Sequence, residues 1–314
     1  MKTPDSSNLD ISIVIPVYRA EKMIDELVTA ILEEISKISP NYEIILVDDR
    51  SPDNSWGRIQ AICQNNPNVK GVKLSRNFGQ HNAIISGISY STGEWVVVMD
   101  CDFQDDPSFI PKLYNEAIKG YEIVFAKRGG RTDGLMKRIT SKIFYKIFAF
   151  LTDLDFDGSV GNFGIYNRKV IEAILLMKES FKIFSLMALW VGFKTTYLET
   201  KHGSRKEGKS SYSYSKLINL AFNICLSYSQ KLLIYTIRIG LTITALSMLF
   251  AAYNIVRHLL GRVTVLGYSS LIASIWLLGG VIILILGVIG LYLGKAFDGI
   301  KNRPVYIVDQ SCNL

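Results

Sequence analysis

The fold is decided by residues 96–107, which read VVVMDCDFQDDP. The apolar beginning predicts a buried strand, and this strand ends abruptly in two carboxylates one residue apart. In an extended chain residues i and i+2 point the same way, so Asp100 and Asp102 would share one face at the strand end. Two carboxylates held that close repel each other unless a cation lies between them. With the amide of Gln104 they form an all-oxygen donor set, which suits Mg²⁺ or Mn²⁺.

The same residues also allow a purely structural interpretation. Asp105 or Asp106 precedes Pro107 and would cap the next helix at its first turn. Because the pattern Asp-x-Asp is short and common by chance, the spacing alone favours the structural interpretation over a metal site.

Strands and helices alternate on both sides of this stretch. Apolar runs at 11–18, 43–47 and 69–74 predict strands, and periodic apolar residues at 21–38 and 55–64 predict helices. This order predicts βαβ units and an α/β domain with a mostly parallel sheet, whose carboxyl strand ends form a ligand crevice. Residues 16–21 contain no glycine, which argues against a nicotinamide dinucleotide site after the first strand.

The C-terminal part of the chain is strongly apolar. Residues 263–294 are 32 positions without a charge, and residues 239–256 are 18 more. Such runs predict two membrane-spanning helices, at about 232–256 and 269–293. Basic residues flank both ends of this hairpin, which places both ends in the cytoplasm. We therefore expect an integral membrane protein with two spans, with a bacterial inner membrane as the best fit.

Three regions follow from this pattern. We expect residues 1–230 to form a cytoplasmic α/β domain, residues 231–294 to contain the two spans, and residues 295–314 to form a cytoplasmic C-terminal tail. The basic, amphipathic segment at 135–151 predicts a helix that lies in the membrane interface, and a core-packed helix with solvated lysines fits this segment equally well. Residues 216–230 are a second candidate for an interfacial helix. The formal net charge is +7, and membrane surfaces and phosphorylated ligands, rather than nucleic acid, are the expected partners. The four cysteines form no Cys-x-x-Cys pair, so neither a zinc site nor a disulfide framework is expected.

Taken together, these motifs resemble family-2 glycosyltransferases of the GT-A fold. Within that family they resemble the polyprenyl-phosphate glycosyltransferases, a branch with dolichol-phosphate mannose synthase and bacterial undecaprenyl-phosphate glucosyl- or aminoarabinosyltransferases. The resemblance covers nearly the whole chain. The matching words are IPVY at 15–18, VDDRS at 47–51, SRNFG at 75–79, DCDFQDDP at 100–107 and GLYLGK at 290–295, with Arg303, Pro304 and Tyr306.

The resemblance implies a UDP- or GDP-linked sugar donor, a polyprenyl phosphate acceptor and a divalent metal, and it permits homo-oligomers. It places Asp100 near the ribose and diphosphate, and Asp102 and Gln104 on the metal, with Asp100 close to it. It implies three further groups of residues: Pro16, Tyr18, Glu21 and Asp49 for the nucleoside, Arg128, Arg138 and Ser141 for the acceptor phosphate, and Arg205 and Lys209 for closing over the donor diphosphate.

Two residues depart from the family pattern. Arg19 stands where relatives often have Asn, and Asn162 stands where relatives often have an acidic residue. In many related transferases a carboxylate in that region would deprotonate a hydroxyl acceptor, which Asn162 cannot do. A phosphate monoester has a second pKa of about 6 and already carries its nucleophilic charge near neutral pH. The departure at Asn162 therefore either favours a phosphate acceptor over a sugar hydroxyl or indicates a different specificity loop.

The leading hypothesis is an inverting, metal-dependent transfer of a single sugar to undecaprenyl or dolichyl phosphate at the cytoplasmic membrane face. One alternative keeps the donor and transfers the sugar to a hydroxyl of a lipid-linked glycan. Another is a non-catalytic membrane scaffold that binds nucleotide. The retention of both aspartates and of the basic loop at 201–216 argues against the scaffold.

Overall fold

The computed structural model describes residues 10–129, 160–177, 182–201, 231–260 and 268–314. These residues fall into two compact units. The first contains the described residues up to 201 together with residues 303–314, and the second contains the described residues of 231–302. The last residues of the chain therefore belong to the same unit as the first.

The first unit is built on one sheet of eight strands, in the order β7-β5-β6-β4-β1-β2-β3-β8. The pairs β1/β2, β1/β4, β2/β3 and β5/β7 are parallel, and β3/β8, β4/β6 and β5/β6 are antiparallel. The expected mixed, mostly parallel sheet is thus confirmed. The strands are β1 (Ile11–Val17), β2 (Tyr42–Asp48), β3 (Val69–Leu74), β4 (Trp95–Val98), β5 (Ile123–Gly129), β6 (Val160–Asn167), β7 (Thr195–Lys201) and β8 (Val308–Cys312).

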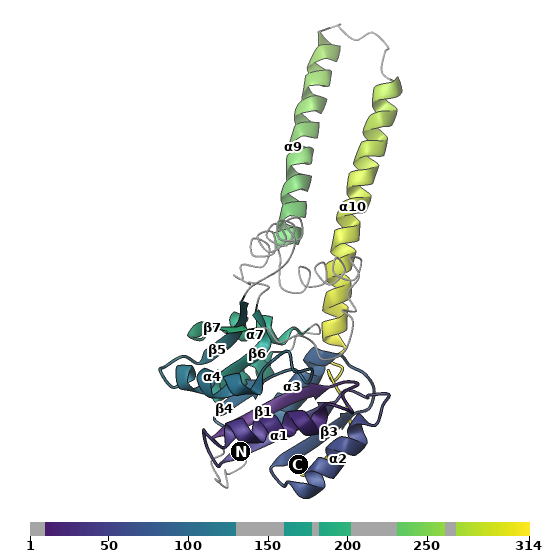
Figure 1. The fold of residues 1–314 in the computed structure, drawn as a ribbon. Helices are drawn as coiled ribbons and strands as arrows, with labels where there is room; N and C mark the ends of the chain where they lie inside the picture. The colour runs from purple at the N-terminus through teal and green to yellow at the C-terminus, as the bar shows by residue number, and fades with distance from the viewer. Residues whose placement is uncertain (1–9, 130–159, 178–181, 202–230, 261–267) are drawn as a thin grey trace. The chain divides into compact units, whose positions relative to one another are not determined.

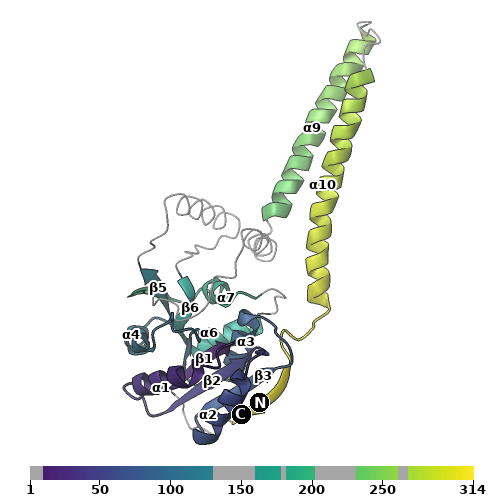
Figure 2. The same cartoon turned by 45° about the vertical axis from the view of Figure 1, so that its right-hand side comes forward.

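Helices cover both faces of this sheet, giving three layers (Figures 1 and 2). Successive side chains of a strand point to opposite faces, so Ile13 and Ile15 pack in one core while Val14 packs in the other. The first core includes α1 (Ile24–Ile35), α2 (Ser55–Asn65) and α4 (Ile110–Ala117), the last preceded by the 3₁₀ turn η1 (Pro107–Phe109). The second core includes α3 (Gln80–Tyr90), α6 (Arg168–Leu176) and α7 (Phe184–Trp190).

The C-terminal segment, which the sequence predicts as a tail, forms a strand of the sheet. β8 pairs antiparallel with β3 and lies at the edge of the sheet, with Cys312 opposite Gly71. Further contacts fasten the segment to α2, because Trp56 Nε1 donates to Gln310 Oε1 (2.7 Å) and Asn313 Nδ2 donates to Cys63 O (2.7 Å). Residues 303–314 therefore complete the sheet and cover the edge that β3 would otherwise expose.

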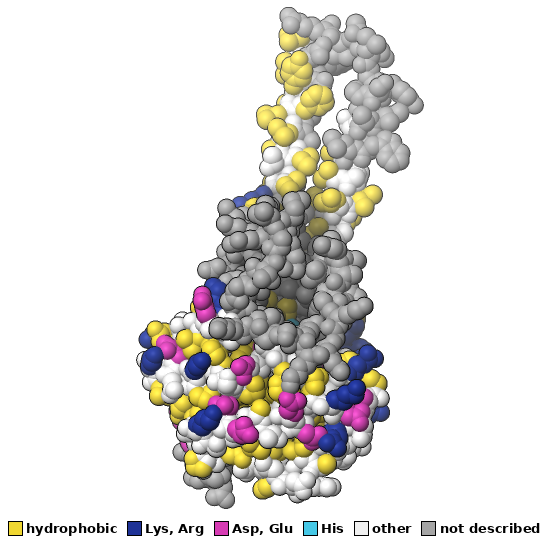
Figure 3. Space-filling view, in the orientation of Figure 1, with side chains coloured by type: hydrophobic (Ala, Val, Ile, Leu, Met, Phe, Trp, Pro, Cys, Tyr) yellow, Lys and Arg dark blue, Asp and Glu magenta, His cyan; other side chains and the backbone are white. Residues whose placement is uncertain are grey.

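The second unit consists of α9 (Lys231–Leu259) and α10 (Tyr268–Ile300), two helices that run antiparallel and contact each other (Figure 2). Among the described residues, one segment is long and apolar enough to cross a membrane, Leu278–Phe297 in α10. None of that segment is buried, and apolar side chains form much of the surface of this unit (Figure 3). α9 contains a shorter apolar stretch, Leu233–Ile243.

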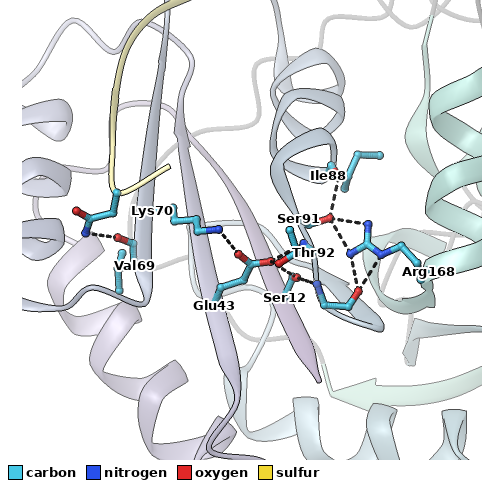
Figure 4. A network of polar contacts seen from close by, with 10 residues as sticks. Ser12, Glu43, Val69, Lys70, Ile88, Ser91, Thr92 and Arg168 are labelled. Carbon is cyan, nitrogen blue, oxygen red and sulfur yellow. Dashed lines mark hydrogen bonds and ion pairs between the residues drawn. The ribbon is translucent and has the colours of Figure 1, made fainter. Parts of the chain in front are cut away.

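A network of polar side chains holds the sheet at the edge where β1 and β2 begin (Figure 4). Its centre is Glu43, which is only 1% exposed and forms an ion pair with Lys70 (Nζ to Oε2, 2.6 Å). Ser12 Oγ donates to Glu43 Oε1 (2.6 Å), and the backbone N–H of Thr92 does the same (2.6 Å). Burial alone would raise the pKa of Glu43, but the hydrogen bonds from Lys70, Ser12 and Thr92 outweigh it and lower the pKa.

Candidate active site

Three neighbouring parallel strands, β4, β1 and β2, end at the same edge of the sheet. The residues that follow them are Met99 and Asp100 after β4, Tyr18 after β1 and Asp49 after β2. The pairing continues beyond the strands, because Asp49 N donates to Val17 O (2.9 Å) and Met99 N donates to Val14 O (3.2 Å). The structure thus brings these predicted site residues to one edge, which is where open α/β sheets bind ligands.

Asp49 is buried, with 2% of its surface exposed, and it uses both carboxylate oxygens. Oδ1 accepts from the backbone N–H of Phe78 (2.7 Å), and Oδ2 accepts from that of Gly79 (2.9 Å). Burial raises the pKa of Asp49 by more than these two hydrogen bonds lower it. Asp49 therefore fixes the loop after β3 in place, and a nucleoside would meet the lone pairs that remain.

Asp48, which the sequence analysis did not single out, is also buried. Its Oδ1 accepts from the backbone N–H of Ser51 (3.1 Å), whereas its buried Oδ2 has no hydrogen-bond partner among the described residues. Burial raises the pKa of Asp48 as well. The signal was present in the sequence as two adjacent aspartates at the end of a strand.

Asp100 is held by contacts from two sides. Its backbone N–H donates to Asp105 Oδ2 (3.0 Å), and its Oδ1 accepts from the side-chain amide of Gln80 (Nε2 to Oδ1, 2.6 Å). Asp106 caps η1, since its Oδ1 accepts from Ser108 N (2.9 Å). The capping interpretation is therefore correct for Asp106. Asp105 holds the end of β4 through the backbone of Asp100, and Asp100 and Asp102 have neither of these two roles.

Asp102 and Gln104, the two predicted metal ligands, contact each other. Asp102 Oδ1 accepts from Gln104 N (3.1 Å), and Asp102 Oδ2 accepts from Gln104 Nε2 (2.7 Å). Because the amide nitrogen faces the carboxylate, a shared cation requires the Gln104 amide to turn its oxygen inward. Among the described residues, no three acidic, histidine or cysteine side chains could together hold a metal ion. A cation here would take the remaining ligands from phosphate oxygens and water, as Mg²⁺ usually does.

The loop after β1 is tied to the start of α2. Glu21 N donates to Asp53 Oδ2 (3.3 Å), and Glu21 Oε2 accepts from Asn54 N (3.2 Å). Arg19, a departure from the family pattern, has a φ of 57° and places its guanidinium 5.4 Å from the centre of the Tyr18 ring. The predicted nucleoside residues Tyr18 and Glu21 thus lie on a loop that α2 supports.

Pro16 lies inside β1, in register with Val47 of β2. Arg128 lies in β5, in register with Thr200 of β7. The remaining predicted residues, Arg138, Ser141, Arg205 and Lys209, and the two predicted interfacial helices at 135–151 and 216–230 lie outside the described residues.

Asn162 lies in β6, next to the strand that delivers Asp100. The last pair of this antiparallel ladder is Val98 with Gly164, so Asn162 lies two residues beyond the part of β6 that pairs with β4, on the side where β4 ends. The Tyr166 hydroxyl donates to the backbone oxygen of Asn162 (2.9 Å).

Gln80 is the site residue that the sequence analysis missed. It is the first residue of α3 and lies 20 positions before its partner Asp100. The available signal was its place directly after the SRNFG word.

A family model, described as glycosyl transferase family 2, matches residues 12–175 of the chain. The chain belongs to this family. It is a glycosyltransferase, and the family predicted from the sequence motifs is confirmed.

Two similar glycosyltransferases show how far the likeness extends. An uncharacterised glycosyltransferase of Synechocystis is 36% identical over 307 residues, which cover 98% of this chain and 96% of the relative. The SfII prophage-derived bactoprenol glucosyl transferase of Shigella flexneri is 34% identical over 305 residues, which cover 96% of this chain and 98% of the relative. Among solved structures, S. aureus TarS 1–349 in complex with UDP-GlcNAc aligns with 69% of this chain and 65% of its own, with 17% identity and a TM-score of 0.48.

Proposed function

We propose that this family-2 glycosyltransferase transfers a single sugar from a UDP- or GDP-linked donor to a polyprenyl phosphate at the cytoplasmic face of a bacterial inner membrane. One observation carries the proposal. The chain contains both a transferase domain with acidic strand ends and an apolar helix, and the candidate membrane span in that helix is not buried. The near full-length likeness to a bactoprenol glucosyl transferase supports the same lipid class as acceptor.

The sheet topology supports two membrane spans rather than one. β7 precedes α9 and β8 follows α10, yet both strands belong to the same sheet. A chain that leaves a domain and returns to it must cross a membrane an even number of times. At about 1.5 Å per residue, the 29 residues of α9 and the 33 residues of α10 each exceed the length needed for a hydrocarbon core of about 30 Å.

This topology also refines the domain boundaries. We propose a catalytic domain that contains residues 1–230 and the returning segment 303–314, with the two spans inside residues 231–302. Both ends of the hairpin then lie on the side of the catalytic domain, which agrees with the cytoplasmic placement that the flanking basic residues predict.

The side chains at the strand ends fit a divalent cation such as Mg²⁺ or Mn²⁺. The available donors are carboxylate and amide oxygens, which hard cations prefer, and Asp102 and Gln104 already lie within hydrogen-bond distance of each other. Asp102 and Gln104 would hold the ion, with Asp100 beside it. A bound cation would supply positive charge that stabilises the diphosphate as it leaves.

The proposed reaction is one in-line displacement with inversion. A phosphate oxygen of the lipid forms a bond to the anomeric carbon of the sugar, and the bond from that carbon to the donor diphosphate breaks. Arg128, Arg138 and Ser141 would orient the acceptor phosphate, while Arg205 and Lys209 would neutralise the leaving diphosphate. Because the acceptor is already an anion, the uncharged amide of Asn162 is sufficient where a hydroxyl acceptor would need a base.

The test is a donor panel, with UDP- and GDP-linked sugars, incubated with undecaprenyl or dolichyl phosphate and the full chain in detergent. We expect a product whose mass equals the lipid phosphate plus one sugar, and which mild acid hydrolyses because a sugar phosphodiester is acid-labile. An acid-stable product formed only on a lipid-linked glycan would instead identify a hydroxyl acceptor. Metal-dependent nucleotide binding without transfer to any acceptor would identify a scaffold and overturn the proposal.

A further inference from the structure

We propose that Gln80 is a positioning residue for Asp100, and that it fixes the Asp100 carboxylate relative to Asp49, the carboxylate at the neighbouring strand end. This inference rests on the proposed function, because it assigns Gln80 a part in placing the donor diphosphate. Gln80 belongs to none of the groups that the family resemblance implies for nucleoside, acceptor or metal.

The contact itself is short and charge-assisted. Gln80 Nε2 donates to Asp100 Oδ1 over 2.6 Å, and hydrogen bonds to an ionised oxygen are stronger than those between neutral groups. A carboxylate at a strand end can rotate about its own side-chain bonds. The amide removes this freedom by fixing one oxygen, and it thereby sets the direction in which the other oxygen points.

The backbone on either side of Gln80 makes this contact rigid. Gly79 has a φ of 92° and a ψ of 151°, a conformation that essentially only glycine adopts, and it directs the chain from the loop after β3 into α3. The N–H groups of Phe78 and Gly79 both donate to Asp49 at the end of β2. Gln80 is therefore held one residue away from a fixed contact with the neighbouring carboxylate.

The next residue, His81, fastens the same turn to a third element. Burial lowers the pKa of His81 to about 4, so the ring is neutral near pH 7. The neutral ring can accept at Nδ1, and Phe184 N at the start of α7 donates to it (3.3 Å). Four consecutive residues, 78–81, thus contact the end of β2, the end of β4 and the start of α7.

This arrangement determines which kinetic constant depends on Gln80. The family resemblance assigns Asp49 to the nucleoside and Asp100 to the ribose and diphosphate. Without the Gln80 amide, Asp49 keeps its two backbone hydrogen bonds, while Asp100 loses the donor that holds its Oδ1. Ground-state binding of the donor should then change little, whereas alignment of the diphosphate during the reaction should suffer, which lowers kcat more than it raises KM.

The test compares Gln80→Ala and the isosteric Gln80→Glu with Gln60→Ala, an exposed glutamine of α2, in the full chain. We expect Gln80→Ala to lower kcat by about tenfold, near the lower end of the effect of a hydrogen bond to a charged group, and to change donor KM by less than about twofold. Gln80→Glu, which replaces the donor with a like charge, should lose at least as much. Gln60→Ala should match the wild type, and all variants should retain the wild-type thermal midpoint.

A double-mutant cycle separates positioning from a general structural effect. Binding of UDP or GDP, each with Mn²⁺, is measured by calorimetry for the wild type, Gln80→Ala, Asp100→Asn and the double variant. UDP and GDP end in the free diphosphate that forms as the sugar leaves, so their affinity reports the alignment of this group even where donor KM does not. If Gln80 acts through Asp100, its substitution weakens UDP or GDP binding severalfold in the wild type but by less than about twofold in the Asp100→Asn background. Equal effects in both backgrounds, or wild-type kcat in Gln80→Ala, would overturn the inference.

The same measurements distinguish the two proposals. If the wild type binds nucleotide with the expected coupling but transfers no sugar, the proposed function is wrong and Gln80 still positions Asp100. If transfer is present and Gln80→Ala is indistinguishable from the wild type, the function stands and the role of Gln80 is wrong. A wild type that neither binds nucleotide nor transfers sugar overturns both.

Discussion

Buried carboxylates at the two ends of β2 lie in opposite electrostatic environments. At its beginning, Glu43 meets Lys70, Ser12 and Thr92, and its pKa is lowered. At its end, Asp48 and Asp49 are equally buried, no ion pair within the described residues includes them, and burial raises the pKa of both. Buried carboxylates that no ion pair holds are typical of ligand sites, so this contrast favours the end of β2 as the ligand end.

The largest expected effect follows from removing a charge at the ligand end. Asp102→Asn keeps the shape of the side chain but removes the negative charge that would hold the cation, so we expect kcat to fall by about 10³-fold or more. Transfer should be measured across a Mn²⁺ titration, because residual activity should require a higher metal concentration. The matched control is Asp25→Asn, because Asp25 is an exposed aspartate of α1 that pairs with Arg58 of α2.

The comparison predicts that the same substitution leaves stability intact. The free energy of unfolding of Asp102→Asn should stay within about 1 kcal/mol of the wild type, because the variant keeps one acceptor for Gln104 and loses the other. Wild-type transfer by this variant, or an unfolded protein, would show that the ligand end is not organised around this charge.

At the start of β2, where Glu43 is paired, a substitution should lower stability more than activity. Glu43→Gln leaves Lys70 without its counter-charge in a buried network, and removing one partner of a buried pair typically costs about 3 kcal/mol or more. Chemical denaturation of the full chain in detergent should show this loss, while kcat of the folded fraction stays at the wild-type value. A loss of kcat without a loss of stability would contradict the division between the two ends.

The pH dependence of stability follows from the same shift. The folded pKa of Glu43 lies below its ordinary value of 4.5, so Glu43 stabilises the protein above that value, and this contribution disappears as the pH falls through the folded pKa. The stability difference between the wild type and Glu43→Gln should therefore shrink below about pH 4.5. A constant difference from pH 7 to pH 4 would show that the charge of Glu43 is not the stabilising feature.

Two glycines, one at each end, allow a finer comparison. Gly93 lies beside Ser12, and a Cβ there would come within 2.7 Å of Ser12 N, so Gly93→Ala must displace the backbone that donates to Ser12 Oγ. We expect it to cost about 2 kcal/mol of stability by overpacking. Gly79→Ala meets nothing within 4 Å, but its φ of 92° strains any other residue, at a cost of about 1–2 kcal/mol.

Activity separates these two variants. Gly79→Ala should lower kcat because Gly79 holds Asp49 and positions Gln80, whereas Gly93→Ala should lower only stability. Thermal unfolding and kcat measured on the same preparations decide the matter. If both variants lost the same activity per folded molecule, the two ends of β2 would not differ in their importance for activity.

The sequence predicted the strands whose signal is local. The starts and ends of β1, β2 and β4 follow from apolar runs that stop at polar residues, and the edge at which Asp49 and Asp100 meet follows from parallel pairing. β8 carries no such signal, because its sequence VDQSC is polar and largely exposed. Its place depends on contacts with residues about 250 positions away, such as Asn313 Nδ2 with Cys63 O, which no local pattern contains.

The site was predictable to a similar degree. Asp100 and Asp102 stand out because two acids interrupt an apolar run, whereas Gln80 is an ordinary surface residue type whose importance depends on one hydrogen bond across the sheet edge. Asp48 was visible as a residue but not as a buried oxygen without a partner in the described part of the chain, since burial is a property of the packed sheet.

The expected effect of Asp49→Asn on stability is also small, and its sign distinguishes the two ends most sharply. The variant keeps one acceptor for Phe78 or Gly79 and loses the other, but it also removes a buried charge, so the two changes should cancel to within about 1 kcal/mol at pH 7. Because the folded pKa of Asp49 is raised above its ordinary value of 3.8, the wild type loses stability as the pH rises through the folded pKa. The variant should therefore gain on the wild type between pH 4 and pH 7, the opposite of Glu43→Gln, while its affinity for UDP or GDP with Mn²⁺ falls. Denaturation curves at both pH values would contradict this if Asp49→Asn lost stability in the way Glu43→Gln does, since the charge at the end of β2 would then be part of the scaffold.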